Sequence, residues 1–200
     1  MITMDSYLNS AISQFKYYQI LGDKTIAQLS EEQLFVQNSE VENSIGVIIN
    51  HLWGNMMSRW TDFKTTDGEK EFRKRDQEFE TVIITKEELL NKWDEGWNCL
   101  FGALESLKRD ELEDVIYIRN QVHKIVEAIN RQLSHYSYHV GQIVLLGKIA
   151  KKKDWESLSI SKGDSKNYNQ EKFSKEKKKT HFTEEYINKK SNDNNNIRNK

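Results

Sequence analysis

Apolar side chains recur every three to four residues along four long stretches of the chain, which is the spacing of amphipathic α-helices. The helices that this pattern predicts cover about residues 4–21, 42–61, 85–107 and 124–151. Gly22 is a plausible stop for the first helix, and proline, which interrupts helices, is absent from the chain. Four long helices with short connections predict an all-α fold, a four-helix bundle.

The segments between these helices carry capping and turn signals. Ser30 is followed three residues later by Gln33, a capping-box pattern that predicts the start of a short helix. Residues 62–80 are polar and contain an Asp-Gly turn signal, so they predict a long ordered loop between the second and third helices. The stretch DVIYIRNQV at 114–122 places β-branched residues around a polar centre and predicts a short hairpin.

Charge divides the chain into an acidic body and a basic end. Residues 151–200 carry 14 Lys and Arg against 8 Asp and Glu, a net of +6, within a chain whose formal net charge is −1. The acidic remainder argues against nucleic-acid binding, for which a basic surface is the usual footprint. The Lys- and Asn-rich end cannot bury much apolar surface. We therefore predict a bundle domain over 1–170 and a disordered tail over 171–200.

The single cysteine, Cys99, excludes an intrachain disulfide and favours a reducing, cytoplasmic compartment. The first residues do not have the charged-then-apolar pattern of a secretory signal. No apolar run approaches the roughly 20 residues that span a bilayer, so no membrane association is expected.

Three of the five histidines carry the candidate chemistry. His135 and His139 are four residues apart on one predicted helix, so they share a face and can offer two imidazoles to one ion. His51 lies on the second predicted helix, which can pack beside the fourth. From spacing alone, the pair is equally compatible with core histidines that hydrogen-bond locally, and for His51 a lone core histidine is the favoured interpretation. His123 and His181 are expected at the surface or at helix caps.

The chain lacks the sequence motifs of several other kinds of metal site and of nucleophilic hydrolases. No histidine follows a glutamate by three residues, as in di-iron bundles, and the chain lacks both a Cys-x-x-Cys pair and a Gly-x-Ser-x-Gly elbow. Cys99 has no basic neighbours on its helix, so an inert buried thiol is expected. The tryptophans at helical spacing are expected to pack in the core, and these are Trp53, Trp60, Trp93 and Trp97.

Three stretches carry a resemblance to a known family. They are HLWGNMMSRWTDFKTTDGEK at 51–70, AINRQLSHYSYHVGQIVLLGK at 128–148 and DWESLSISKGDSKNYN at 154–169. With His51 on the second helix and a His-x-x-x-His pair on the fourth, the chain resembles an uncharacterised bacterial branch of the DinB-like superfamily of metal-binding four-helix bundles. The resemblance covers about residues 3–170. The prolines that this branch often has near the positions of Glu71 and Ser161 are absent here.

The resemblance implies that His51, His135 and His139 together hold a divalent ion, Zn²⁺ or Ni²⁺. It also implies a homodimer, and an enzyme that uses a low-molecular-weight thiol such as bacillithiol, mycothiol or glutathione in a transferase or isomerase reaction.

The leading hypothesis is thus a metal-dependent thiol S-transferase acting on a small-molecule substrate. Asn55, Arg59 and Gln142 are candidates to orient ligands or substrate. A metal-dependent hydrolase is less attractive, because no carboxylate base is evident beside the histidines, although Asp or Glu residues of the loop could reach in. A non-catalytic, stress-related bundle with a metal site is the remaining alternative, although three ligands with an open position are unusual for a structural ion.

Overall fold

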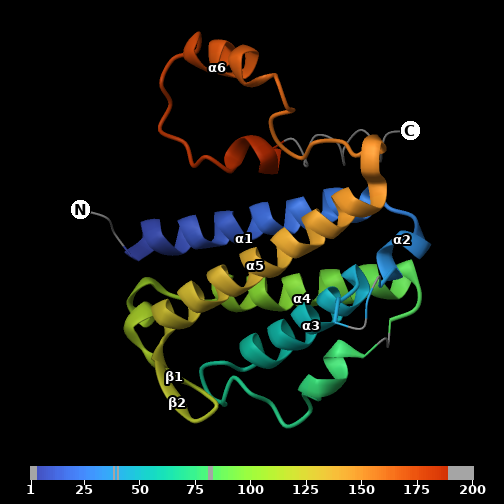
Figure 1. Ribbon diagram of the computed structural model, residues 1–200. Helices are drawn as coiled ribbons and strands as arrows, with labels where there is room; N and C mark the ends of the chain where they lie inside the picture. The colour runs from blue at the N-terminus through green and yellow to red at the C-terminus, as the bar shows by residue number, and fades with distance from the viewer. Residues whose placement is uncertain (1–3, 38, 40, 81–82, 189–200) are drawn as a thin grey trace, which may run out of the picture.

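Four long helices form the body of the molecule in the computed structural model, which describes residues 4–37, 39, 41–80 and 83–188. These helices, which lie side by side in Figure 1, are α1 (Met4–Ala27), α3 (Ile45–Trp60), α4 (Lys86–Glu105) and α5 (Ile125–Lys151). Helix α3 packs against α4 and α5, and α1 packs against α5 and α4, which closes the ring around one core. The predicted four-helix bundle is confirmed.

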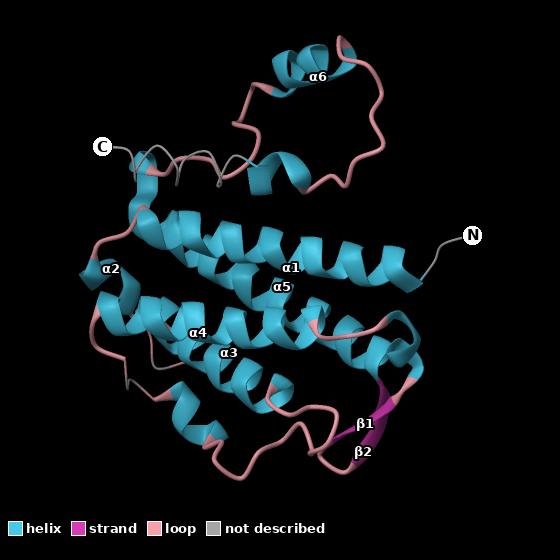
Figure 2. Cartoon of the chain, turned by 180° about the vertical axis from the view of Figure 1, so that it is seen from behind, coloured by secondary structure: helices cyan, strands magenta, loops and turns pink. Residues whose placement is uncertain are grey.

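Shorter elements connect and extend the bundle. Helix α2 (Glu31–Phe35) and the 3₁₀ helix η1 (Arg75–Phe79) flank α3 in the chain, and the 3₁₀ helix η2 (Arg109–Glu113) follows α4. Strands β1 (Val115–Ile118) and β2 (Gln121–Lys124) pair antiparallel at one end of the bundle (Figure 2), as the hairpin prediction expected. A 3₁₀ turn, η3 (Lys152–Asp154), and helix α6 (Ser165–Phe173) follow α5.

Side-chain caps set the helix starts. The Ser44 hydroxyl accepts from the backbone N–H of Val47 at 3.2 Å and begins α3, and Thr85 caps α4 through Glu88 in the same way. The capping box predicted for Ser30 is confirmed at the start of α2. Each such cap satisfies a backbone donor that the helix leaves open, worth about 1 kcal/mol.

The predicted end of α1 at Gly22 is wrong, because the helix continues to Ala27. Gly22 serves the packing of two helices instead. A Cβ at this position would lie 2.3 Å from the Trp93 ring, so the absence of a side chain lets α1 and α4 approach closely. The six further residues, 22–27, include Thr25 and Ile26, which are buried.

The centre of the bundle is aromatic. Phe15, Trp97 and Tyr136 are fully buried and their rings contact one another at centroid distances of 5.7 to 6.4 Å. Core packing is confirmed for Trp60, Trp93 and Trp97, whereas Trp53 is half-buried.

The predicted ordered loop over 62–80 is present and includes η1. Its Asp67 carboxylate accepts hydrogen bonds from the backbone N–H groups of Arg119 and Asn120, the two hairpin-turn residues with positive φ. Burial of the carboxyl raises the pKa of Asp67, but the backbone hydrogen bonds from Asn120, Glu69 and Arg119 outweigh it and lower that pKa. The hairpin and the loop are thereby held together as one rim at this end of the bundle.

Beyond α5 the chain leaves the bundle and returns to it. Tyr17 of α1 contacts the ring of Phe182 and the ring of Tyr186, which lies in a helical stretch that begins at residue 184. Part of the predicted tail, 189–200, lies outside the described residues, and the division at residue 170 stays a prediction. No helix in the described part of the chain is long and apolar enough to cross a membrane.

Candidate metal centre

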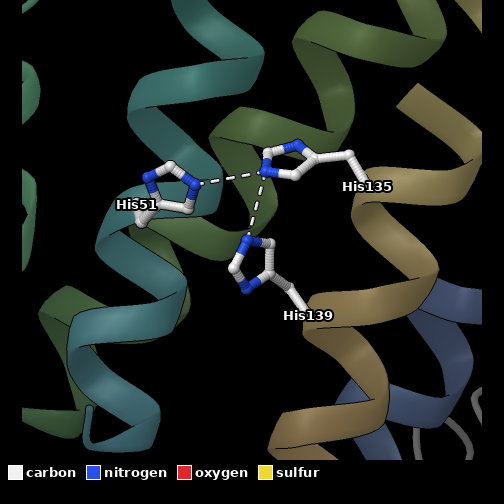
Figure 3. Close-up of side chains that lie close together, drawn as sticks. All are labelled: His51, His135 and His139. Carbon is white, nitrogen blue, oxygen red and sulfur yellow. Dashed lines mark hydrogen bonds between the residues drawn. The ribbon is translucent and has the colours of Figure 1, made fainter. Parts of the chain in front are cut away.

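The three histidines of the sequence hypothesis meet between two helices. His51 projects from α3, and His135 and His139 project from consecutive turns of α5 toward it (Figure 3). The Nε2 atom of His135 lies 3.2 Å from Nε2 of His51 and 3.1 Å from Nε2 of His139. His51 is 5% exposed, and the other two are half-buried. In the described part of the chain no other group of three His, Cys or acidic side chains converges in this way.

Hydrogen bonds fix which ring nitrogens face the centre. His51 Nδ1 lies 2.9 Å from Oε2 of Glu78, and a carboxylate only accepts, so Nδ1 carries the proton. His139 Nδ1 lies 3.0 Å from Oε1 of Gln142 and donates to it. In its neutral form each of these two rings turns an Nε2 lone pair inward, which is the arrangement that a cation needs.

The spacings from His135 to the other two histidines fit one shared ion, and the three ligand nitrogens all lie within 4.8 Å of one another. Nitrogens bound at about 2.0–2.1 Å to one metal are roughly 2.9 to 3.4 Å apart for angles between 90° and tetrahedral. The observed separations of 3.1 and 3.2 Å fall inside that range. Without a cation, these contacts require His135 to carry its proton on Nε2 and to donate it to one of the other two rings.

The surroundings keep two of the rings neutral. Burial, reinforced by the repulsion that His139 and His51 exert when they are protonated, lowers the pKa of His135 to about 3. Burial also lowers the pKa of His139 to about 4, although its hydrogen bond with Gln142 acts in the opposite direction. Neutral imidazole is the form that binds metal, so these two rings are ready to bind at neutral pH without losing a proton.

A carboxylate from the loop lies beside the histidines, an alternative that the sequence left open. Glu78 is 5% exposed, and besides His51 it binds Arg73 through two hydrogen bonds of 2.6 and 2.9 Å. Burial raises the pKa of Glu78, but the bonds from Arg73 and His51 outweigh it and lower that pKa, so the side chain is ionised. Glu78 comes from η1, in the loop, where no helical periodicity marks a position as inward-facing.

The α3 helix is shaped to admit this glutamate. A Cβ at Gly54 would lie 2.3 Å from Oε1 of Glu78, so the glycine leaves the space that the carboxylate occupies next to the helix. Phe79, the following residue, stacks on the His51 ring with a centroid distance of 4.8 Å. His51 is thus held by a carboxylate at its ring edge and by an aromatic ring on its face.

Of the three residues predicted to orient ligands or substrate, one contacts a histidine and the other two border the same cavity. Gln142 contacts His139 directly. The Asn55 side chain accepts a hydrogen bond of 3.1 Å from the Tyr136 hydroxyl, and Arg59 donates to the backbone oxygen of Gly68. Asn55 and Arg59 border the same cavity as the histidines, with a volume of about 410 Å³. Their action on a ligand or substrate stays a prediction.

The other two histidines lie away from this centre. His123 Nδ1 is 3.0 Å from the backbone oxygen of Gln121 in the hairpin. His181 contacts Ser10 and Thr183 near the N-terminal half of α1.

Comparison with known families adds one finding. The model of a family described as a protein of unknown function, DUF1572, matches residues 3–164. The curated proteins compared with the chain include no match. The match spans the whole bundle and all three histidines, and the chain therefore belongs to the DUF1572 family.

Proposed function

We propose that this chain, as a member of the DUF1572 family, is a DinB-like, divalent-metal-binding enzyme that activates a low-molecular-weight thiol for transfer to a small electrophile. The observation that carries the proposal is the convergence of three Nε2 atoms, two of them on rings whose Nδ1 protons are held by Glu78 and Gln142. The placement of one histidine on α3 and two on α5 supports the DinB-like assignment.

His51, His135 and His139 would hold the ion, and Glu78 and Gln142 would keep two of the rings in the binding tautomer. Three neutral ligands leave the full charge of a divalent ion uncompensated, so a bound thiol would be a thiolate at neutral pH. The half-buried rings of His135 and His139 border the cavity, so a small molecule can reach the site from that side. The sulfur would then attack the electrophilic carbon and displace its leaving group.

The charges around the cavity favour this reaction over hydrolysis by metal-bound water. No Asp or Glu is among the described residues that line the cavity. The nearest carboxylate, Glu78, is engaged by both Arg73 and His51, and its lowered pKa makes it a poor proton acceptor. A hydrolytic mechanism that relies on a separate general base finds no carboxylate for that role among the described residues of this cavity lining.

Metal analysis of the purified protein tests the first half of the proposal. We expect about one divalent ion per chain, lost in His51→Ala and in His135→Ala but retained in His123→Ala, whose imidazole lies in the hairpin. Equal metal content in all four proteins would refute the site.

A conjugation assay tests the second half. The metal-loaded protein is mixed with bacillithiol, mycothiol or glutathione in turn and with a generic electrophile. We expect faster conjugation with one of these thiols, abolished by His135→Ala. If the protein binds metal and accelerates conjugation with none of the three thiols, the transferase reaction is refuted and the non-catalytic alternative takes its place.

The proposal also includes a homodimeric state and a cytoplasmic location for the protein.

A further inference from the structure

Arginine dominates the cavity beside the histidines. Five arginines from separate parts of the chain line it, together with polar and aromatic side chains: Arg59, Arg73, Arg75, Arg119 and Arg131. Such a concentration of one charge in a partly enclosed space attracts ions of the opposite sign.

Acidic residues that do not line the cavity themselves neutralise part of the positive charge of these arginines. Glu78 binds Arg73, and Glu69 lies 3.2 Å from both Arg73 and Arg119. Asp76 is 3.9 Å from Arg75 at an exposed position, where an ion pair contributes little. Two arginines, Arg59 and Arg131, have no carboxylate partner among the described residues.

Arg59 is the more informative of the two, because it is 4% exposed. Its guanidinium has five N–H donors, yet it makes one hydrogen bond, from Nη1 to the Gly68 oxygen at 3.0 Å, and its buried Nε has no partner in the described residues. Burial lowers the pKa of Arg59 to about 10, so the group is still a cation at neutral pH. A buried, uncompensated cation is destabilising, which points to a ligand that compensates it.

The cavity lining contains a second unpartnered polar group and a second cation with no carboxylate partner among the described residues. Gln132, one turn before His135, is 2% exposed and its buried Oε1 has no hydrogen-bond partner in the described residues. The neighbouring Arg131 is exposed at the cavity edge, and its Nη1 lies 3.2 Å from Nε2 of His123. Arg59 from α3 and Arg131 from α5 thus border one space that also contains the histidine site.

We infer that this cavity binds the anionic group of the small molecule that reacts at the histidines, a carboxylate, phosphate or sulfonate, with Arg59 and Arg131 as its binding residues. The inference rests on the proposed function for the reaction itself, but the anion site is defined by residues other than the metal ligands. Guanidinium groups bind such anions through paired, charge-assisted hydrogen bonds.

Binding of small anions tests this inference directly. Isothermal titration at pH 7 and low salt measures inorganic phosphate and succinate against the metal-free and the Zn²⁺-loaded protein, with glycerol as the neutral control. Phosphate and succinate distinguish a phosphate ligand from a carboxylate ligand. We expect saturable binding of at least one of them, weakened by added NaCl because the attraction is electrostatic.

Two variants and a matched control locate the site. Arg131→Gln removes an exposed cation and is expected to weaken anion binding about tenfold, or ~1.4 kcal/mol. Arg59→Gln is expected to weaken it at least as much, with circular dichroism to verify folding. Lys148→Gln makes the same charge change on α5, at an exposed position outside the cavity, and should leave the affinity within about twofold.

Three results would overturn the inference: no saturable anion binding in either form of the protein, unchanged affinity in Arg131→Gln, or an equal loss in Lys148→Gln. A failure of the metal site can be distinguished from these three anion-binding results. If the protein binds no metal but the metal-free form binds phosphate or succinate through Arg131, the proposed function is refuted and the anion site stands.

Discussion

Replacement of Glu78 by Gln tests whether the carboxylate beside His51 tunes the metal site. The carboxylate accepts the Nδ1 proton of His51 at 2.9 Å, and this bond both fixes the ring and makes its Nε2 more basic. Gln keeps the shape and one acceptor oxygen but loses the charge. Partners of this kind typically contribute roughly 10- to 100-fold to metal affinity, so Glu78→Gln should weaken Zn²⁺ binding by about 1.4–2.7 kcal/mol.

The same substitution should destabilise the fold, because Glu78 also neutralises Arg73. Their side chains are 6% and 3% exposed, and loss of one partner from a buried ion pair costs about 3–5 kcal/mol. The Gln oxygen can still accept one of the two hydrogen bonds from Arg73, so a loss near the lower end of that range is expected. Urea unfolding of the metal-free protein measures it.

Glu69→Gln is the matched control for this experiment. Glu69 also binds Arg73, at 3.2 Å, but it is more exposed and does not contact a histidine. Competition with a chromophoric chelator at pH 7 gives the Zn²⁺ affinity of both variants. The reasoning predicts a large loss for Glu78→Gln and less than about a twofold change for Glu69→Gln. Equal affinities in the parent and Glu78→Gln would refute it, and so would an equal loss in both variants.

Three further predictions follow from the same contacts. Gly54→Ala should reduce Zn²⁺ affinity as Glu78→Gln does while all charges remain, because its Cβ would lie 2.3 Å from Oε1 of Glu78, and chelator competition measures the loss. The metal-free protein should lose stability as the pH falls from about 6.5 toward 4, because the unfolded chain takes up protons that the folded His135 and His139, with pKa values of about 3 and 4, do not. Urea unfolding between pH 7 and 5 should show this slope, up to about 1.4 kcal/mol per pH unit for each histidine, and a flat profile would contradict it. Asp67→Ala should lower the free energy of unfolding by about 1–3 kcal/mol, since two hairpin-turn N–H groups lose their acceptor, and a change below about 0.5 kcal/mol would show that the loop does not hold the hairpin.

Helical periodicity predicted only that His135 and His139 share a face, whereas the inclusion of His51 was implied by the family resemblance and is seen as a convergence of side chains in the structure. His135 and His139 lie four residues apart on one helix, and His51 lies on the apolar helix that packs beside it. The start of α2 was also predictable, because a capping box depends only on residues three apart in the sequence: the Ser30 side chain accepts a hydrogen bond from the backbone N–H of Gln33.

Glu78 could not be predicted, because its position depends on the path of an irregular loop and on the space that Gly54 leaves 24 residues earlier. The end of α1 was missed because Gly22 was interpreted as a local helix stop, whereas its neighbour Trp93 lies on a distant helix. The arginines of the cavity come from α3, the loop, the hairpin and α5, so no sequence window contains them together.

X-ray absorption at the zinc edge, on protein loaded with one equivalent of Zn²⁺, tests the central claim most directly. The account predicts a shell containing three imidazole nitrogens at about 2.0–2.1 Å, with no sulfur ligand from the protein. In His51→Ala the imidazole contribution should fall to two, or the ion should be lost. A sulfur shell from Cys99, or a spectrum unchanged by His51→Ala, would contradict the three-histidine site.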